Sequence, residues 1–123
     1  MTLLLDTRAL LWLLAGDVRV EGVRDAIADP RTPVLVSAVC VWEAAIKSAL
    51  GKLRVPDDLP DRLDEFAFER LSVSDEHAWA VRTLPPLHND PFDRLLAAQA
   101  ICERATIVSA DTIFDGYGLT RIW

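Results

Sequence analysis

Short apolar runs alternate with amphipathic stretches along this 123-residue chain, and this alternation restricts the fold more than any other feature. Runs such as Leu3–Leu5 contain no polar residue, which is typical of strands covered on both faces of a parallel sheet. The stretches between them repeat apolar residues at spacings of three and four, which indicates helices. Strands and helices in alternation predict a three-layer α/β/α domain with a central, mostly parallel sheet and right-handed crossovers.

Caps and helix breakers set the expected boundaries of these elements. The expected strands are Leu3–Leu5, Pro33–Val36, Arg70–Val73, Ala105–Ser109 and Thr120–Trp123. The expected helices are Thr7–Leu14, Arg19–Ala28, a helix capped by Ser37 that ends near Ala49, Leu59–Phe68, a helix opened by Ser74 that ends near Thr83, and a helix that follows Asp90.

The helix after Asp90 has the clearest start signal in the chain. Asp90 fits the N-cap, Pro91 fits the first helical position, and Asp93 falls at the third. Three polar residues interrupt the segment from Phe92 to Cys102, so the helix is expected to be buried on most sides.

Asp93 shares its helix face with apolar residues one and two turns on, such as Leu96 and Ala100. A carboxylate that points into a core is costly unless it is paired or binds a metal. The alternative is that Asp90 and Asp93 both cap and charge the first turn, which explains Asp90 better than Asp93.

Three further acids are expected near Asp93. Asp6 ends the first strand, Asp111 follows the strand Ala105–Ser109, and Glu43 lies two turns into the helix that leaves Val36. Ligand sites in parallel α/β sheets lie beyond the carboxyl ends of the strands, where these residues meet. For Glu43 two interpretations remain open, namely a surface ion pair with Lys47 or a carboxylate at the bottom of an acidic pocket beside Lys47.

Crowded carboxylates repel one another unless some are protonated or a divalent cation neutralises them. An all-oxygen site suits Mg²⁺ or Mn²⁺, and such sites perform phosphoryl chemistry. The net charge of −6 excludes a simple electrostatic nucleic-acid binder, which would be basic. A bound cation would cancel the repulsion between an acidic protein and a polyanion.

The composition, with 51% hydrophobic and 26% charged residues, is that of an ordinary globular chain, so residues 1–123 are expected to form a single domain. No apolar run reaches the ~18 residues that span a bilayer, and no signal peptide is expected. Cys40 and Cys102 lie in apolar helical patterns and are expected to be buried thiols. The expected location is therefore cytoplasmic, with no membrane contact.

Four segments carry a family signature, in order and at suitable spacing: Leu3–Thr7, Trp42–Ala44 after Ser37, Asp90–Ala100, and Val108–Asp111. They resemble the PIN domain family and, more narrowly, the VapC-type toxins of bacterial type II toxin–antitoxin pairs. The Asp-Pro-Phe-Asp-Arg segment that begins at Asp90 is the most specific part. The resemblance implies a three-layer α/β/α domain with Mg²⁺- or Mn²⁺-dependent endoribonuclease activity.

The resemblance also implies roles for individual residues. Asp6, Glu43 and Asp93 match the acidic triad, and Asp111 matches the less regular fourth acid. We expect Asp6, Asp93 and Asp111 to hold the metal and Glu43 to orient or deprotonate the attacking water. The remaining matches are the small hydroxyl positions Thr7 and Ser109, the extra acid Asp90, which touches the site or only caps, and Arg94, which faces phosphate, antitoxin or solvent.

The implied partners are an RNA substrate, a small DNA-binding antitoxin and a second copy of the chain. Trp12 and Trp42 are expected to be core or dimer contacts, while His77 and His88 are expected to be exposed and without chemistry. Two alternatives stay open: a PIN nuclease of RNA processing that has no antitoxin, and a catalytically silent PIN binding module.

Overall fold

The computed structural model covers residues 1–123 and contains one five-stranded sheet in the order β3-β2-β1-β4-β5. All neighbouring strands are parallel, and the central strand β1 pairs Leu4 with Leu35 on one side and with Ile107 on the other. The prediction of a parallel sheet is confirmed. The strands are β1 (Leu3–Leu5), β2 (Val34–Ser37), β3 (Glu69–Leu71), β4 (Thr106–Val108) and β5 (Arg121–Ile122).

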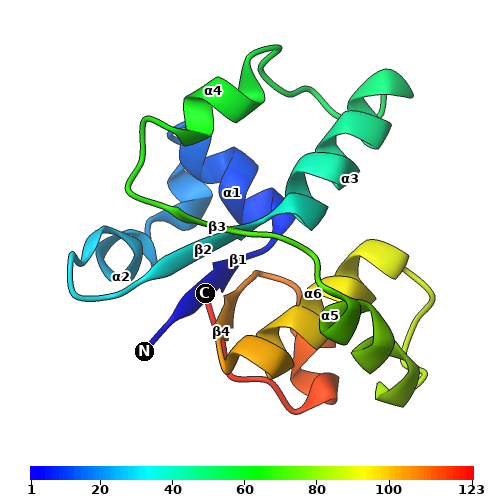
Figure 1. The fold of residues 1–123 in the computed structure, drawn as a ribbon. Coiled ribbons are helices and arrows are strands. Elements are labelled where there is room, and N and C mark those ends of the chain that lie inside the picture. The colour runs from blue at the N-terminus through cyan, green and yellow to red at the C-terminus, as the bar shows by residue number, and fades with distance from the viewer.

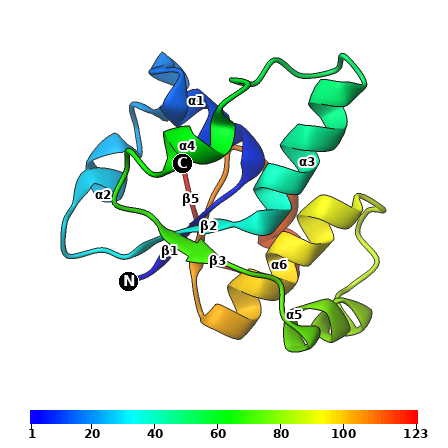
Figure 2. The same ribbon diagram turned by 45° about the horizontal axis from the view of Figure 1, so that its top comes forward.

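Helices cover both faces of the sheet, which confirms the three-layer prediction (Figure 1). One face is covered by α1 (Thr7–Leu14), α2 (Arg24–Ala28) and α4 (Leu59–Leu63), and the other by α5 (Asp75–Ala80) and α6 (Pro91–Glu103). The long helix α3 (Ala38–Ala49) leaves β2 at the carboxyl edge of the sheet and packs against both α1 and α6 (Figure 2). Short 3-10 helices are η1 (Val18–Val20), η2 (Val81–Thr83) and η3 (Thr112–Tyr117).

The core lies on both sides of the central strands. Leu3, Leu4 and Leu5 are completely buried, as are Ile107 in β4 and Phe114 in η3. Burial of side chains of this size contributes about 1.5–3 kcal/mol each, which explains why the apolar runs became the central strands. None of the helices is both long enough and apolar enough to cross a membrane.

Two expected helices are shorter in the structure than the sequence predicted. The helix expected over 19–28 divides into η1 and the five-residue α2, because Gly22 lies in a turn and Val23 provides no side-chain cap. The helix expected over 59–68 ends at Leu63, where the following Asp64 and Glu65 repel the negative end of the helix dipole. The helix expected to end near Thr83 is α-helical only to Ala80 and continues as η2. The other elements differ from prediction by one or two residues at their ends.

The two cysteines have different surroundings. Cys40 is buried, and burial raises the pKa of its thiol to about 12. Cys102 on α6 is partly exposed, so the expectation that both thiols are buried is wrong for Cys102. The chain has no disulfide, in agreement with the sequence expectation.

Candidate active site

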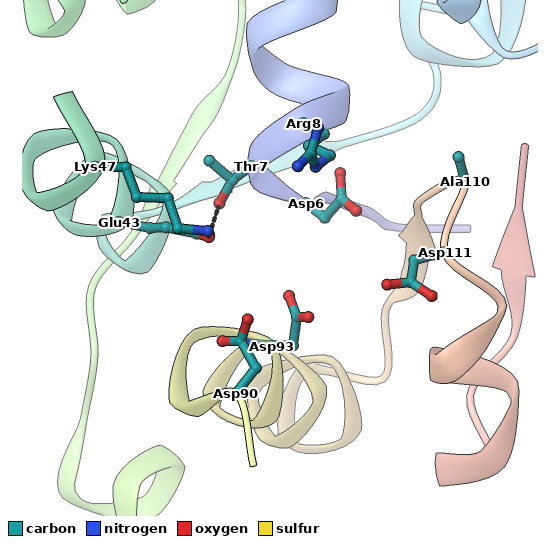
Figure 3. A pocket seen from close by; sticks show the side chains of 9 residues that line it. All are labelled: Asp6, Thr7, Arg8, Glu43, Lys47, Asp90, Asp93, Ala110 and Asp111. Carbon is teal, nitrogen blue, oxygen red and sulfur yellow. Dashed lines mark hydrogen bonds and ion pairs between the residues drawn. The ribbon is translucent and has the colours of Figure 1, made fainter. Parts of the chain in front are cut away.

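A pocket of about 340 Å³ opens at the carboxyl edge of the sheet and is lined almost entirely by polar side chains. The structure brings the four predicted carboxylates into this one pocket from four segments of the chain. Figure 3 shows Asp93 rising from α6 toward Asp6, with Glu43 on one side and Asp111 on the other. The complete lining is Asp6, Thr7, Arg8, Glu43, Lys47, Asp90, Asp93, Ala110 and Asp111.

Asp6 and Asp111 both follow strands and both cap the helices that come next. The Asp6 side chain accepts a hydrogen bond from the Ala9 N–H at 2.8 Å, and Asp111 accepts one from the Ile113 N–H at 3.0 Å. Asp6 is buried, with 7% of its surface exposed, whereas Asp111 is exposed. The caps fix each carboxylate against the backbone, so both side chains are held at the pocket without help from a ligand.

Glu43 combines the two interpretations that the sequence left open. It is 6% exposed at the bottom of the pocket, and its Oε2 also forms an ion pair with Lys47 one turn on. Its Oε1 accepts a hydrogen bond of 2.5 Å from the Thr7 hydroxyl (Figure 3). Both oxygens are therefore held, and Thr7 is placed where the family resemblance implied a hydroxyl.

The two aspartates of α6 have different roles in the structure. Asp90 is the N-cap, because its Oδ1 accepts from the N–H groups of Phe92 at 2.9 Å and Asp93 at 3.2 Å, and it also lines the pocket. The Asp93 side chain makes no capping bond. Its Oδ2 lies 3.4 Å from Nε2 of His88, so capping does not account for Asp93.

The environment of the pocket disfavours the charged forms of two carboxyl groups. Burial first, and then the negative charges of Asp90, Glu43 and Asp6, raise the pKa of Asp93 to about 6, although the His88 hydrogen bond lowers it in part. Burial also raises the pKa of Asp6, while hydrogen bonds from Ser109 and Ala9 lower it in part. Ser109 is fully buried beside Asp6 and also accepts from the Asp111 N–H at 2.9 Å.

The chemistry of these donors fits Mg²⁺ or Mn²⁺, since every acidic group offers hard oxygen atoms. No three acidic, imidazole or thiol groups lie close enough together to ligate a single ion. Mg²⁺ usually keeps several waters and uses one or two carboxylates, so the pocket fits an ion held partly through water.

A second, smaller hollow of about 230 Å³ adjoins the acidic pocket and is bordered by three cations, Arg8, Lys47 and Lys52. Thr7 and Glu43 line both hollows. The acidic pocket thus has a basic side, which sequence analysis missed. The signal was weak, because Arg8 and Lys52 are distant in sequence and neither belongs to a motif.

Arg94 is partly buried and does not line the acidic pocket. Its Nη1 donates to the Pro85 carbonyl at 2.9 Å and lies 3.4 Å from the Tyr117 hydroxyl, so it braces the loop before α6. The expectation of exposed histidines is wrong. His77 is 5% exposed and completes a capping box with Ser74, and His88 is partly buried beside Asp93.

The tryptophans divide into two kinds. Trp12 packs against Trp123, with ring centroids 5.6 Å apart. Trp42 is 51% exposed and contacts Phe92 edge-on at 4.9 Å, and Trp79 is 68% exposed. Trp42 and Trp79 are therefore surface residues, and a core role is excluded for Trp42.

Comparison with known proteins places the chain in a family. The family model described as PIN domain matches residues 3–118. This chain therefore belongs to the PIN domain family. A curated relative, Ribonuclease VapC16 of Mycobacterium tuberculosis, is 38% identical over 68 residues, which make up 52% of this chain and 48% of that protein. The match spans about half of the relative.

Solved structures with the same fold are complexes of toxin–antitoxin type. VapBC2 from Rickettsia felis, bound to a DNA fragment from its promoter, matches with a TM-score of 0.75 and 18% identity over 100% of this chain and 99% of that one. FitAcB from Neisseria gonorrhoeae matches with a TM-score of 0.70 and 22% identity over 98% and 96% of the two chains. At these identities the likeness establishes the shared fold.

Proposed function

We propose that this protein is a Mg²⁺- or Mn²⁺-dependent endoribonuclease and the toxin of a type II toxin–antitoxin pair. The observation that carries the proposal is the meeting of Asp6, Glu43, Asp93 and Asp111 in one pocket at the carboxyl edge of the sheet. The ribonuclease name of the relative and the toxin–antitoxin fold neighbours support it.

Asp6 and Asp93 would hold the metal, directly or through water, with Asp111 completing the shell. When bound, the ion would polarise the phosphate and lower the pKa of a coordinated water. Asp6 and Asp93 are suited to this position because burial first, and neighbouring carboxylates second, raise the pKa of each, and a bound cation would offset both effects. The caps on Asp6 and Asp111 keep these carboxylates oriented before an ion arrives.

Glu43 orients the attacking water, and Thr7 holds Glu43 in place. For Glu43 to accept the proton of that water, Lys47 must release Oε2, and an arriving phosphate is the natural competitor for Lys47. The water oxygen bonds to phosphorus as the bond to the 3′ oxygen breaks. The products are a 5′-phosphate and a 3′-hydroxyl, and the ribose 2′-hydroxyl takes no part.

Arg8, Lys47 and Lys52 would bind phosphates that flank the scissile one. Their position explains how a chain with a net charge of −6 receives a polyanion, because positive charge is concentrated beside the pocket. Arg8→Gln and Lys52→Gln should raise KM for RNA more than they lower kcat.

The test of the activity is cleavage of RNA by purified protein with Mn²⁺, with Mg²⁺ and after thorough chelation. The proposal expects cleavage with either metal, none in EDTA, and 5′-phosphate ends. Undiminished cleavage in EDTA, or products with 2′,3′-cyclic phosphates, would overturn it. Asp61→Asn is a matched control, because Asp61 is an exposed acid on α4 that does not line the pocket.

The toxin role is tested by the partner. Purification from the native host should yield a small DNA-binding antitoxin bound to this chain. A ribonuclease that purifies alone would favour the alternative of an RNA-processing nuclease, and a chain inactive with every metal would favour the silent module.

The pocket also defines how an antitoxin would inhibit. An extended tail that orders on binding can place one basic side chain among Asp6, Glu43, Asp93 and Asp111, in competition with metal. Arginine is better suited than lysine because its fork matches a carboxylate. Changing the basic residues of the tail to alanine should relieve inhibition; if neither these changes nor Mn²⁺ alters it, the tail blocks RNA elsewhere.

The exposed side chains of Trp42 and Trp79 provide apolar surface that supports self-association. Analytical ultracentrifugation at micromolar concentration should show a homodimer, and Trp79→Glu should shift it toward monomer. A monomer in the unmodified protein would leave the antitoxin as the partner for this surface.

A further inference from the structure

Four side chains from three segments form a line that ends at Asp93. Arg94 Nη1 lies 3.4 Å from the Tyr117 hydroxyl, that hydroxyl lies 2.6 Å from Nδ1 of His88, and Nε2 of His88 lies 3.4 Å from Oδ2 of Asp93. None of these contacts is needed to cap α6, since Asp90 supplies its cap. The line therefore requires a different explanation.

The chemistry of the two ends of the line sets the direction of its hydrogen bonds. A guanidinium group has donors and no acceptor, so Arg94 donates to the Tyr117 oxygen. An ionised carboxylate has acceptors and no donor, so Asp93 accepts from Nε2 of His88. A neutral imidazole that carries its proton at Nε2 accepts at Nδ1, so Tyr117 directs its own O–H to Nδ1 in the shortest contact of the line.

Contacts with other parts of the protein fix the side chains of the line in place. Arg94 Nη1 also donates to the Pro85 carbonyl at 2.9 Å, and Tyr117 is 7% exposed. The loop that carries His88 is seated on η3 next to Gly116, where an added Cβ would lie 2.5 Å from Cδ1 of Leu87. His88 and Asp93 side chains are 23% and 22% exposed, so water has limited access to their contact.

We propose that His88 is a positioning residue for Asp93, with its Nε2–H tautomer set jointly by the Asp93 carboxylate at Nε2 and by the Tyr117–Arg94 pair at Nδ1. His88 holds Oδ2 of Asp93 and leaves Oδ1 without a hydrogen bond to the protein. A neutral donor suits this position, because it orients the carboxylate without a positive charge that would compete with a cation. Asp93's part in metal binding rests on the proposed function, whereas the tautomer does not.

The tautomer is tested in the metal-free protein by long-range ¹H–¹⁵N correlation spectra of labelled histidine at about pH 8, well above the ordinary pKa of histidine. His88 should show the Nε2–H pattern. In Tyr117→Phe the Nδ1 acceptor loses its donor, and the pattern should move toward a mixture of tautomers. An Nδ1–H pattern in the unmodified protein, or one that Tyr117→Phe leaves unchanged, would overturn the proposal.

The positioning effect is tested by Mn²⁺ titration, followed by calorimetry or electron paramagnetic resonance. His88→Ala should weaken Mn²⁺ binding roughly 10- to 100-fold, the range found when partners of metal ligands are removed. His88→Gln should recover most of the affinity, because the glutamine amide nitrogen lies near the position of Nε2. Unchanged Mn²⁺ affinity in His88→Ala with an unchanged melting temperature would overturn the proposal.

The two proposals fail in distinguishable ways. If the unmodified protein shows the Nε2–H tautomer and loses Mn²⁺ affinity in His88→Ala but never cleaves RNA, the ribonuclease proposal is wrong and the positioning role stands. If it cleaves RNA with Mn²⁺ and His88→Ala changes neither Mn²⁺ affinity nor kcat, the opposite holds.

Discussion

Helix α6 carries polar side chains into the protein at two places, and their surroundings are opposite. Gln99, in the middle of the helix, is completely buried. Its Oε1 accepts from the Ser37 hydroxyl at 2.5 Å, and its Nε2 donates to the Ser72 carbonyl at 3.3 Å. Since Ser37 also caps α3, this amide ties α6 to the helix that carries Glu43.

Asp93, in the first turn, has a single side-chain hydrogen bond, of 3.4 Å, and its pKa is raised first by burial and then by three negative neighbours. A buried polar group whose bonds are all made fixes the fold, whereas a group crowded by like charges weakens the metal-free fold and creates a binding site for a cation. Two positions on one helix thus separate stability, at Gln99, from function, at Asp93.

The largest expected effect is the loss of activity when Asp93, the functional position on α6, is changed. Asp93→Asn should lower kcat/KM for RNA about 1000-fold, equivalent to ~4 kcal/mol of transition-state stabilisation. Its melting temperature in EDTA should equal or exceed that of the unmodified protein, because a repelling charge has gone. Full activity in a folded Asp93→Asn protein would refute the assignment of Asp93.

The next largest effect is the loss of stability when Gln99, the structural position on α6, is changed. Gln99→Leu leaves the Ser72 carbonyl and the Ser37 hydroxyl without this partner, so unfolding in urea should show a loss of about 1–3 kcal/mol. A double-mutant cycle with Ser37→Ala isolates the shared bond. Additive losses in the cycle would show that the contact between Gln99 and Ser37 contributes nothing.

The pH dependence of stability tests the cost of the Asp93 charge in the folded protein. Because the pKa of Asp93 is raised in the folded protein, its charged form costs stability, and this cost is absent below the ordinary aspartate pKa near 3.8. In EDTA, the unmodified protein should therefore lose stability relative to Asp93→Asn as pH rises from about 4 to about 6, and the difference should then level off. Thermal melts across this range measure it; a constant difference would contradict the shift.

The smallest effect concerns Asp90, which both caps α6 and lines the pocket. Asp90→Ala removes the cap and should cost about 1 kcal/mol. Asp90→Ser keeps a capping oxygen and removes the charge, so it should be close to the unmodified protein in stability. If Asp90→Ser also leaves Mn²⁺ affinity unchanged, Asp90 only caps.

The parallel sheet and the acidic pocket were predictable because both follow from local signals. Continuous apolar runs mark central strands, and Asp6, Asp93 and Asp111 each stand at the end of a strand or the start of a helix, which topology places on one edge. The short helices α2 and α4 were not predictable in length, because tertiary packing and end charges decide them against a weak periodicity.

The surroundings of the pocket were beyond sequence reasoning for a different reason. The contact of His88 with Tyr117 joins positions 29 apart through a loop without periodicity, and the buried state of His77 depends on α5 packing against α6. Arg94 stands beside Asp93 in the motif yet turns to the Pro85 carbonyl, a choice that the loop conformation alone decides.

The central position of β1 in the sheet has a consequence for folding during synthesis on the ribosome. Leu3 in β1 pairs with Thr106 in β4, so β1 is enclosed on this side only after a strand that is synthesised much later has emerged. Asp6 emerges early, but Asp93 and Asp111 reach it only after β4 is inserted beside β1. In a nascent chain, therefore, acids of the pocket are already present but have not yet been brought together into the pocket. If the ribonuclease proposal holds, the translating ribosome and its messenger are spared until β4 and Asp111 have been synthesised.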